Sequence, residues 1–246
     1  MQLTDATVIV TGASRGFGRA IARSFHDQGA TVVGVATSAS RLAVVGDELG
    51  PRFVPITADV ADPMLVERLL DDHKPDIVVL NAGAATVNRP IQGQTWETLS
   101  RHWNVDVRQT FEWVRAALTR PLAAGSTVLT LSSGAAIGGS PLSGGYAGAK
   151  ATVRFLTQYA ADESERAELG IRFLSILPKL TPSTDLGAAA VAAYADRIGR
   201  TIPEYLDVLG PSLAADDVGR AITDLAAGDE PSGAFLLGAD GPRRLP

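Results

Sequence analysis

The sequence predicts an α/β fold in which helices cover both faces of a doubly wound parallel sheet, giving three αβα layers. Two observations carry this prediction. Short apolar runs rich in β-branched residues alternate along the chain with amphipathic stretches of helical period, a pattern typical of successive βαβ units. The apolar runs also lack polar alternation, as expected of strands that are buried on both faces.

The elements follow one another in a regular order. A first helix is expected where Phe17, Ile21 and Phe25 recur at spacing four, ending before Gly29. Further helices are expected at 40–49, from Asp62-Pro63, at about 95–118 and 146–167, and at 216–227. The expected strands are Thr7–Val10, Thr31–Val35, Phe53–Ile56, Ile77–Leu80, Thr127–Leu131 and Ile171–Leu177.

Composition and charge limit the possible functions. The chain has 246 residues, a formal net charge of -5 and no cysteine, so disulfides, thiolate nucleophiles and cysteine-bound metals are excluded. No basic cluster offers the footprint that nucleic acid needs, so nucleic acid is not an expected partner. The N-terminal segment resembles neither a signal peptide nor a membrane span, so a cytoplasmic protein is expected. No metal is expected, because His26, His73 and His102 lack metal-ligand spacing.

No linker divides the chain, so a single domain over residues 1–246 is expected. The segment 180–211 is rich in Ala, Gly and Pro and precedes the last expected helix. Long connections of this kind are often functional lids. We expect this one to cover the substrate, the alternative being an ordinary pair of surface helices.

A glycine-rich turn, TGASRGFG at Thr11–Gly18, joins the first strand to the first helix. Glycines let the backbone approach a pyrophosphate, and the following helix N-terminus offers free N–H groups. The strand–turn–helix context favours a Rossmann-like dinucleotide site over a merely structural turn. The residues expected to contact the cofactor here are Gly12, Ser14, Arg15, Gly16, Phe17 and Gly18.

The end of the second strand favours NADP over NAD. A carboxylate there would bind the ribose 2′-hydroxyl of NAD, but the sequence reads Val-Ala-Thr-Ser at 35–38. Arg15 is expected to meet a 2′-phosphate, with Arg41 a weaker candidate and Thr37 and Ser38 as hydrogen-bond donors. The alternative for Arg15 is a solvated loop arginine.

Two further strand ends are expected to line the cofactor crevice. Asp59 and Val60 follow the third strand, where Asp59 can accept the adenine amino group or simply cap a helix. Asn81, Ala82 and Gly83 follow the fourth strand, where small residues let the backbone lie against the cofactor.

Tyr146 and Lys150 are the candidate acid–base pair. They lie four residues apart at the start of an expected helix, so they share a face. A nearby ammonium favours the phenolate form of a tyrosine, which provides a proton donor for a carbonyl or a base for an alcohol. Taken alone, a tyrosine followed four residues later by a lysine is more often an ordinary pair of exposed helix residues.

Two polar residues support the pair. Ser133 follows the fifth strand, where its hydroxyl can hold the substrate oxygen, a strand-end cap being the alternative. Asn104 lies inside a long expected helix, although asparagine is a poor helix former. It can bind a water that links Lys150 to solvent, the alternative being an exposed polar residue.

Together these motifs make the chain similar to the short-chain dehydrogenase/reductase family of the one-domain type. The match comprises TGxxxGxG at 11–18, Asp59-Val60, Asn81–Gly83, Asn104, Ser133 and YxxxK at 146–150.

The resemblance implies an oxidoreductase acting on CH–OH donors with NAD(P) as acceptor, and it assigns roles to the motif residues. By this resemblance Tyr146 is the acid/base, and Lys150 lowers the pKa of that tyrosine and binds the nicotinamide ribose. Ser133 positions the carbonyl or hydroxyl, and Asn104 carries a proton relay. An arginine in the glycine turn, Arg15 here, accompanies a preference for NADP in this family. The resemblance also implies that subunits pair through the two long helices as a homodimer or homotetramer.

The sequence departs from the family pattern beside the expected nicotinamide. Pro178, an expected cofactor contact, is followed by Lys179 where the family usually has glycine. Lys179 can contact cofactor phosphate, meet an anionic substrate or point to solvent. The family threonine that follows is out of register, so Ser183 and Thr184 are both candidates to touch the carboxamide.

The sequence therefore predicts an NADP(H)-dependent oxidoreductase that interconverts a carbonyl and a secondary alcohol of a small molecule. One alternative is a catalytically idle NADP-binding sensor or partner-binding module, and another is an epimerase or dehydratase variant. A medium-sized, largely apolar ketone is expected, because the pocket is expected to be lined by Ala84, Ala135, Ile137, Pro141 and Leu142, with Lys179 and the segment 180–211.

Overall fold

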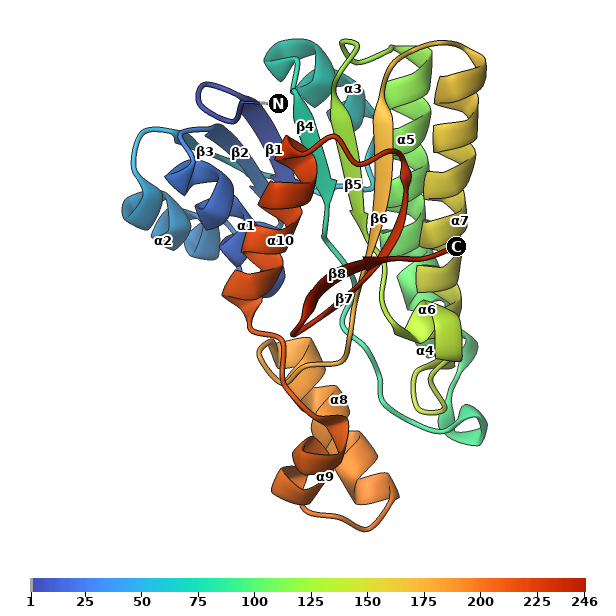
Figure 1. The fold of residues 1–246 in the computed structure, drawn as a ribbon. Helices are drawn as coiled ribbons and strands as arrows, with labels where there is room; N and C mark the ends of the chain where they lie inside the picture. Colours follow the sequence, from blue (N-terminus) through green and yellow to red (C-terminus); the bar gives the residue numbers. More distant parts are fainter. Residues whose placement is uncertain (1) are drawn as a thin grey trace.

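One sheet of eight strands forms the centre of the computed structural model, which describes residues 2–246 (Figure 1). The strand order is β3-β2-β1-β4-β5-β6-β7-β8, with β8 antiparallel to β7 and every other pairing parallel. Because the order reverses between β1 and β4, the sheet is doubly wound and Rossmann-like, as predicted. The strands are β1 (Thr7–Thr11), β2 (Thr31–Ala36), β3 (Phe53–Thr57), β4 (Ile77–Leu80), β5 (Thr127–Leu131), β6 (Arg172–Pro178), β7 (Gly233–Gly238) and β8 (Gly241–Arg244).

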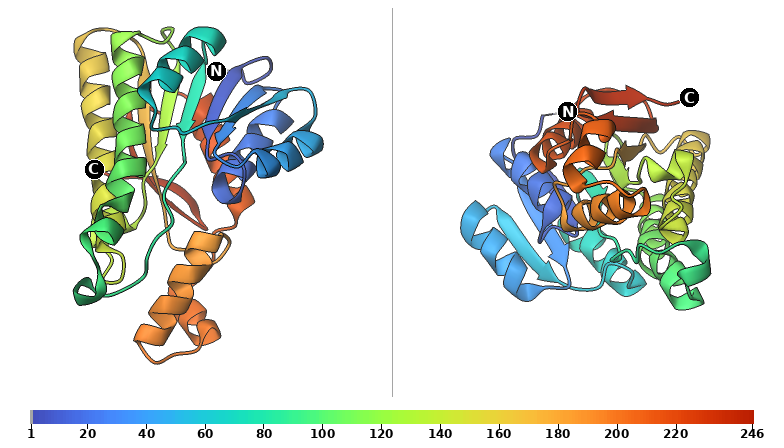
Figure 2. Two further views of the ribbon diagram at one scale, coloured as in Figure 1. Left: turned by 180° about the vertical axis from the view of Figure 1, so that it is seen from behind. Right: turned by 90° about the horizontal axis from the view of Figure 1, so that it is seen from below.

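Helices cover both faces of this sheet, which gives the three predicted layers (Figure 2). One apolar core lies between the sheet and α1 (Gly16–Asp27), α2 (Ala39–Leu49) and α10 (Ala215–Ala227). The other lies between the sheet and α3 (Pro63–His73), α5 (Arg108–Thr119) and α7 (Gly144–Arg166). Shorter elements complete the chain: η1 (Ile91–Gly93), α4 (Trp96–His102), η2 (Trp103–Val107), α6 (Ala135–Gly138), α8 (Asp185–Arg197) and α9 (Ile202–Leu209).

The central strand β1 shows why uniformly apolar runs become inner strands. Val8 and Val10 belong to one core and Ile9 belongs to the other, and all three side chains are 0% exposed. Successive side chains of a strand point to opposite faces of the sheet. Only a run that is apolar at every position can therefore bury both faces.

The helix expected at 95–118 differs from the prediction because it is interrupted. The segment Trp103–Val107 forms a turn of π-helix, η2, between α4 and α5. A π-turn places one extra residue in the helical ladder, so it changes which side chains share a face before and after it. A regular apolar period does not reveal such a turn.

The segment 180–211 forms α8 and α9, which project beyond the carboxyl ends of the strands (Figure 1). Tyr194 of α8 stacks on Tyr205 of α9, with ring centroids 6.3 Å apart. The Tyr194 hydroxyl also shares a hydrogen bond with Ser140 Oγ. These contacts connect the projecting helices to the loop between α6 and α7.

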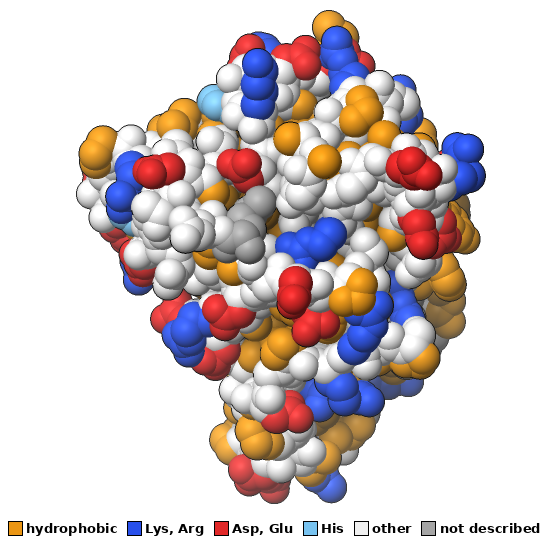
Figure 3. Space-filling view, turned by 45° about the horizontal axis from the view of Figure 1, so that its top comes forward, with side chains coloured by type: hydrophobic (Ala, Val, Ile, Leu, Met, Phe, Trp, Pro, Cys, Tyr) orange, Lys and Arg blue, Asp and Glu red, His pale blue; other side chains and the backbone are white. Residues whose placement is uncertain are grey.

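On the face shown in Figure 3, basic and acidic side chains are interspersed. Among the described residues 2–246, no helix is both long enough and apolar enough to cross a bilayer. The same residues contain no group of three or more His, Cys, Asp or Glu side chains that would hold a metal ion.

Trp113 of α5 offers a direct test of the packing between α5 and the sheet. Its side chain is 1% exposed and its indole N–H donates to the Val60 carbonyl at 3.0 Å. Trp113→Phe leaves that buried carbonyl without its donor and opens a cavity, so we expect a loss of about 2–3 kcal/mol of unfolding free energy. Urea denaturation measures it. Trp96→Phe is the matched control, because Trp96 is 74% exposed and should change stability by less than about 0.5 kcal/mol.

Candidate active site

The candidate site lies at the carboxyl ends of β1, β4 and β5, beside the reversal of strand order. The glycine turn follows β1, Asn81 follows β4 and Ser133 follows β5, while Tyr146 is on α7. In open α/β sheets, ligands bind in the crevice outside the carboxyl ends of the strands at such a switch point.

The turn after β1 is a cradle that added side chains would fill. Gly12 has a φ of +67°, and a Cβ there would lie 2.8 Å from Asn81 Nδ2. A Cβ on Gly18 would lie 2.1 Å from the Gly12 carbonyl oxygen. Helix α1 starts at Gly16, and its N-cap residue Arg15 makes no side-chain capping bond, which leaves the first N–H groups to an anion. The cradle therefore fits a pyrophosphate.

A buried hydrogen-bond network holds this cradle against the loop that follows β4. Thr11 Oγ1 accepts the backbone N–H groups of Asn81 and Ala82 at 2.9 and 3.1 Å, and donates to Gln109 Oε1 at 2.6 Å. The Asn81 amide donates to the Thr11 carbonyl at 3.0 Å. Gln109 Nε2 completes the network at the Ala82 carbonyl, 2.9 Å away. The Asn81 side chain thus braces the turn.

Arg15, the residue expected to meet a 2′-phosphate, is paired with the projecting helices. Its Nη1 lies 2.9 Å from Asp185 Oδ2 on α8, and the two side chains are 52% and 81% exposed. An ion pair this exposed contributes little free energy. An incoming phosphate can therefore compete with Asp185 for the guanidinium.

Other residues expected around the adenosine have local partners. Ser38 Oγ accepts the N–H of Arg41 as the N-cap of α2. Asp59 Oδ1 accepts the Ala61 N–H at 3.0 Å within the turn before α3, and the N-cap of that helix is Asp62. Thr37 is exposed beside the end of β2.

Lys150 fixes the start of α7 to the end of β5. Its ammonium donates to the Leu131 carbonyl at 2.8 Å, and its own carbonyl accepts the Ser132 hydroxyl at 2.7 Å. Lys150 is buried and Tyr146 is half-buried, with Lys150 Nζ 5.8 Å from the centre of the tyrosine ring. Ser133 Oγ accepts the N–H of Ala135 at 3.2 Å, and the described part of the chain provides no acceptor for its own proton.

The structure does not bring Asn104 into this group, so the expected relay residue must be corrected. Asn104 is exposed. Asp106, two positions later in η2, is 1% exposed, and its Oδ1 lies 3.0 Å from Lys150 Nζ. Helical residues two apart do not face the same way, so only one of the two can point inwards. Asp106 therefore takes the place expected of Asn104.

A pattern in the sequence marks Asp106 as the inward residue. The buried face of this helical region includes His102, Asp106, Gln109 and Trp113, which recur at helical spacings of three and four. Asp106 lies on this buried stripe, whereas Asn104 lies off it. The spacing of Asp106 from His102 and Gln109 was the available signal in the sequence.

Burial and charge oppose each other at Lys150 and Asp106. Burial, the largest influence, would raise the pKa of Asp106, but the Lys150 ammonium, His102 and the Ala84 N–H hold that pKa below its ordinary value. Burial would likewise lower the pKa of Lys150, yet the Asp106 carboxylate and Tyr146 hold it above its ordinary value. Both side chains are therefore charged at neutral pH, as a buried ion pair.

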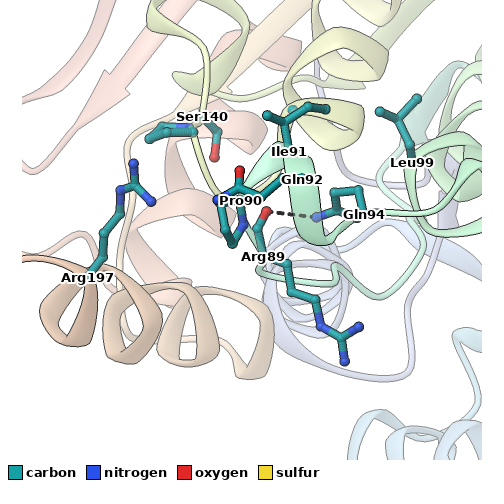
Figure 4. Close-up of a pocket in the computed structure, with 10 residues that line it drawn as sticks. Arg89, Pro90, Ile91, Gln92, Gln94, Leu99, Ser140 and Arg197 are labelled. Carbon is teal, nitrogen blue, oxygen red and sulfur yellow. Dashed lines mark hydrogen bonds between the residues drawn. The ribbon is translucent and has the colours of Figure 1, made fainter.

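A pocket of about 280 Å³ lies beside the N-terminus of α7 (Figure 4). Arg197 reaches from α8 towards Ser140, and the Gln94 amide donates to the Arg89 carbonyl at 2.9 Å. Long-range contacts place the segment 89–94 here, and the sequence did not indicate it. The lining residues are Arg89, Pro90, Ile91, Gln92, Gln94, Leu99, Ser140, Pro141, Gly144 and Arg197.

Of the expected pocket residues, Pro141 lines this pocket, whereas Ala84, Ala135, Ile137, Leu142 and Lys179 do not. The Ala84 N–H instead donates to Asp106 Oδ2 at 2.9 Å. Lys179 is exposed, and its ammonium lies beside Gly238, 3.4 Å from where a Cβ on that glycine would stand. Its side chain therefore follows the end of β7.

The wall expected beside the nicotinamide is held by local bonds. The Pro178 carbonyl accepts the Gly134 N–H at 2.9 Å, which joins the ends of β6 and β5. Ser183 Oγ donates to the Leu213 carbonyl at 3.0 Å, and Thr184 Oγ1 caps α8 by accepting a backbone N–H. These bonds position the segment from which α8 rises.

A glycine-rich turn between the first strand and the first helix of a doubly wound sheet is the arrangement that binds dinucleotides. The model of the short chain dehydrogenase family matches residues 6–195 of this chain, which therefore belongs to that family. It is an oxidoreductase of the kind that acts on CH–OH groups with NAD(P).

Individual relatives agree with this assignment. Hydroxynaphthalene reductase-like protein Arp2 of Metarhizium robertsii is 35% identical over 245 residues, which cover 92% of this chain and 90% of the relative. The crystal structure of levodione reductase has a TM-score of 0.83 at 22% identity and covers 95% of this chain and 96% of its own. The structure of 3-ketoacyl-(acyl-carrier-protein) reductase from Brucella melitensis, complexed with NADH, has a TM-score of 0.78 at 24% identity. The match covers 96% of this chain and 97% of the reductase. These two structures share the fold.

Gly18→Ala tests the cradle. The new Cβ would lie 2.1 Å from the Gly12 carbonyl oxygen, so the turn must open and its N–H groups must move. We expect NADPH to bind roughly tenfold more weakly or worse, as measured by fluorescence titration. Gly46→Ala in α2 is the control, because its Cβ meets only Phe53 at an ordinary 3.8 Å. Equal affinity in the two variants would contradict the assignment.

Proposed function

We propose that the protein interconverts a carbonyl and a secondary alcohol by hydride transfer, with Tyr146 as the acid/base. The observation that carries this proposal is the half-buried Tyr146 beside the buried Lys150, on the helix fixed to the end of β5. When bound, the nicotinamide supplies the hydride for reduction or accepts it in oxidation. In reduction the Tyr146 hydroxyl gives its proton to the carbonyl oxygen, and in oxidation the phenolate takes it back.

Three side chains prepare that proton transfer. Ser133 has a hydroxyl proton to donate to the substrate oxygen, since the described residues provide no other acceptor for it. Lys150 holds a positive charge beside Tyr146 and is available to the ribose of the nicotinamide. Asp106, rather than Asn104, completes the set by pairing with Lys150.

NADP(H) is the proposed cofactor in preference to NAD(H). No carboxylate follows β2, where Thr37 and Ser38 stand, so nothing there repels a 2′-phosphate. Arg15 is exposed and only weakly held by Asp185, which leaves its guanidinium free to exchange partners.

A medium-sized, largely apolar ketone is the proposed substrate class. The pocket beside α7 is walled in part by Pro90, Ile91, Leu99 and Pro141. The relative Arp2 is named as hydroxynaphthalene reductase-like, which supports an aromatic or polycyclic compound. We propose that the segment 180–211 acts as the lid, since α8 contacts both the cofactor turn and the loop before α7.

Assembly through α5 and α7 is proposed, as a homodimer or homotetramer. Phe111 of α5 is 46% exposed, and Phe155 and Tyr159 of α7 are 56% and 58% exposed. The rings of Phe155 and Tyr159 stack with centroids 6.2 Å apart. Exposed aromatic clusters of this kind are typical of interfaces. The cytoplasmic location and the single-domain organisation both stay predictions.

Tyr146→Phe tests the acid/base role. Losing the phenolic proton should lower ketone reduction by roughly a hundredfold to ten-thousandfold, while NADPH titration still shows binding. Tyr159→Phe is the matched control, because Tyr159 is 58% exposed on the same helix. Substantial turnover by Tyr146→Phe would refute the role. Tight NADPH binding by the wild type without turnover of any ketone would favour the sensor alternative, and product formation without net cofactor consumption would favour the epimerase or dehydratase alternative.

Arg15→Ala tests the cofactor preference. Removing a charge-assisted contact to the 2′-phosphate should raise the KM for NADPH about tenfold to a hundredfold and leave the KM for NADH nearly unchanged. Asp185→Asn frees the same guanidinium, so a small gain in NADPH affinity is expected. Arg41→Ala is the comparison that separates the two candidate arginines. An equal effect of Arg15→Ala on both cofactors would contradict the preference.

A further inference from the structure

The Asp106 carboxylate is enclosed by groups from several elements. From α7, Lys150 Nζ approaches Oδ1 to 3.0 Å. From the end of α4, His102 Nδ1 lies 3.5 Å from Oδ2, and from the loop after β4 the Ala84 N–H donates at 2.9 Å. Lys150 Nζ also lies 5.8 Å from the centre of the Tyr146 ring. The rings of Tyr146 and His102 pack edge-on, with their centroids 5.3 Å apart. Among the described residues, these are the titratable groups that face Asp106.

The charge balance of this cluster decides which form of Tyr146 it favours. An unpaired buried ammonium beside a phenol favours the phenolate, which is the base for alcohol oxidation. Here a carboxylate stands 3.0 Å from that ammonium. It cancels most of the ammonium's field at the phenol, and its negative charge also opposes a second negative charge nearby. Lys150 and Asp106 together therefore carry no net charge, and the pair does little to favour loss of the phenolic proton.

The pairing has a second consequence for Lys150. The lysine side chain is 6% exposed, and an ammonium so deeply buried would otherwise tend to lose its proton. The carboxylate keeps it charged, and the Leu131 carbonyl fixes its direction at 2.8 Å. Asp106 thus keeps Lys150 protonated and at the same time offsets its positive charge.

We propose that Asp106 is a positioning residue that acts through Lys150: it holds the ammonium in place and offsets its charge, so that the ammonium favours the phenolate form of Tyr146 less than an unpaired lysine would. This inference rests on the proposed function, because it assigns the protonated, carbonyl-reducing state of the site to one carboxylate.

Asp106→Asn is the direct test, read as the pH dependence of ketone reduction. Reduction needs the protonated site, so its rate falls as the pH rises through the site's ionisation. Removing the anion leaves the ammonium unopposed beside the phenol, so proton loss from Tyr146 becomes easier. The midpoint should therefore move to lower pH by about one to two units. A merely structural role would lower the rate at every pH and leave the midpoint in place.

Three further variants make the shift specific. Asp162→Asn deletes the same charge from an exposed position on α7 and should leave the midpoint unchanged. His102→Gln removes the imidazole but keeps the ion pair, so its midpoint should also stay. Asp106→Glu keeps the charge, and we expect the wild-type midpoint even where the longer side chain lowers kcat. This variant still decides the matter if Asp106→Asn does not fold, since a midpoint shifted down in Asp106→Glu would overturn the proposal.

A titration without cofactor or substrate separates this inference from the proposed function. The tyrosinate absorbance of each protein is followed with pH, and that of its Tyr146→Phe counterpart is subtracted, which isolates Tyr146. We expect its ionisation at lower pH in Asp106→Asn than in the wild type. An unshifted titration in folded Asp106→Asn overturns the inference. Absence of ketone turnover by the wild type would contradict the proposed function alone.

Discussion

The buried ion pair between Lys150 and Asp106 is the interaction on which the site depends. It connects α7 to the π-helical turn η2, while the Leu131 carbonyl and the Ala84 N–H tie the pair to the ends of β5 and β4. Removing one partner of such a pair leaves the other charge buried and unpaired, which typically lowers the free energy of unfolding by about 3–5 kcal/mol. The position of Tyr146 above the strand ends follows from this pairing, because Tyr146 is carried by the same helix turn as Lys150.

The cofactor cradle and the projecting helices are also mechanically connected. Helix α8 reaches the glycine turn through Asp185 and Arg15, and it reaches the loop before α7 through Tyr194 and Ser140. Both contacts lie at the carboxyl edge of the sheet, where cofactor and substrate are proposed to meet. A phosphate that takes Arg15 from Asp185 would release one of these two attachments. These two contacts are the basis for proposing that the segment 180–211 is a lid.

Local patterns predicted much of this molecule. Uniformly apolar runs identified the inner strands such as β1, and Asp62-Pro63 marked the start of α3, where the Asp62 side chain accepts the Met64 N–H at 3.0 Å. The glycine turn and the Tyr146–Lys150 pair could be named from the sequence because each motif lies within a few residues, and their roles stay proposals. These features depend on backbone geometry and short spacings, which sequence periodicity conveys.

The features that sequence reasoning missed depend on long-range contacts or on which face of a helix is buried. Asn104 was expected because asparagine is a poor helix former and therefore stands out inside a helix, whereas the structure buries Asp106 and leaves Asn104 exposed. The pairing of Arg15 with Asp185 joins residues far apart in the chain. The segment 89–94 lines a pocket only because the fold brings it against α7 and α8.

The charge state of Lys150 tests the account most directly. The sequence contains three lysines, Lys74, Lys150 and Lys179, so lysine-selective isotope labelling gives a spectrum with few signals, and Lys150→Arg assigns the one of interest. Nuclear magnetic resonance of the side-chain nitrogen distinguishes ammonium from amine as the pH is raised. We expect Lys150 to remain an ammonium at neutral and mildly alkaline pH, because Asp106 holds its pKa above the ordinary value of a lysine. A neutral amine at pH ~7, well below the reference pKa of lysine, would contradict the account.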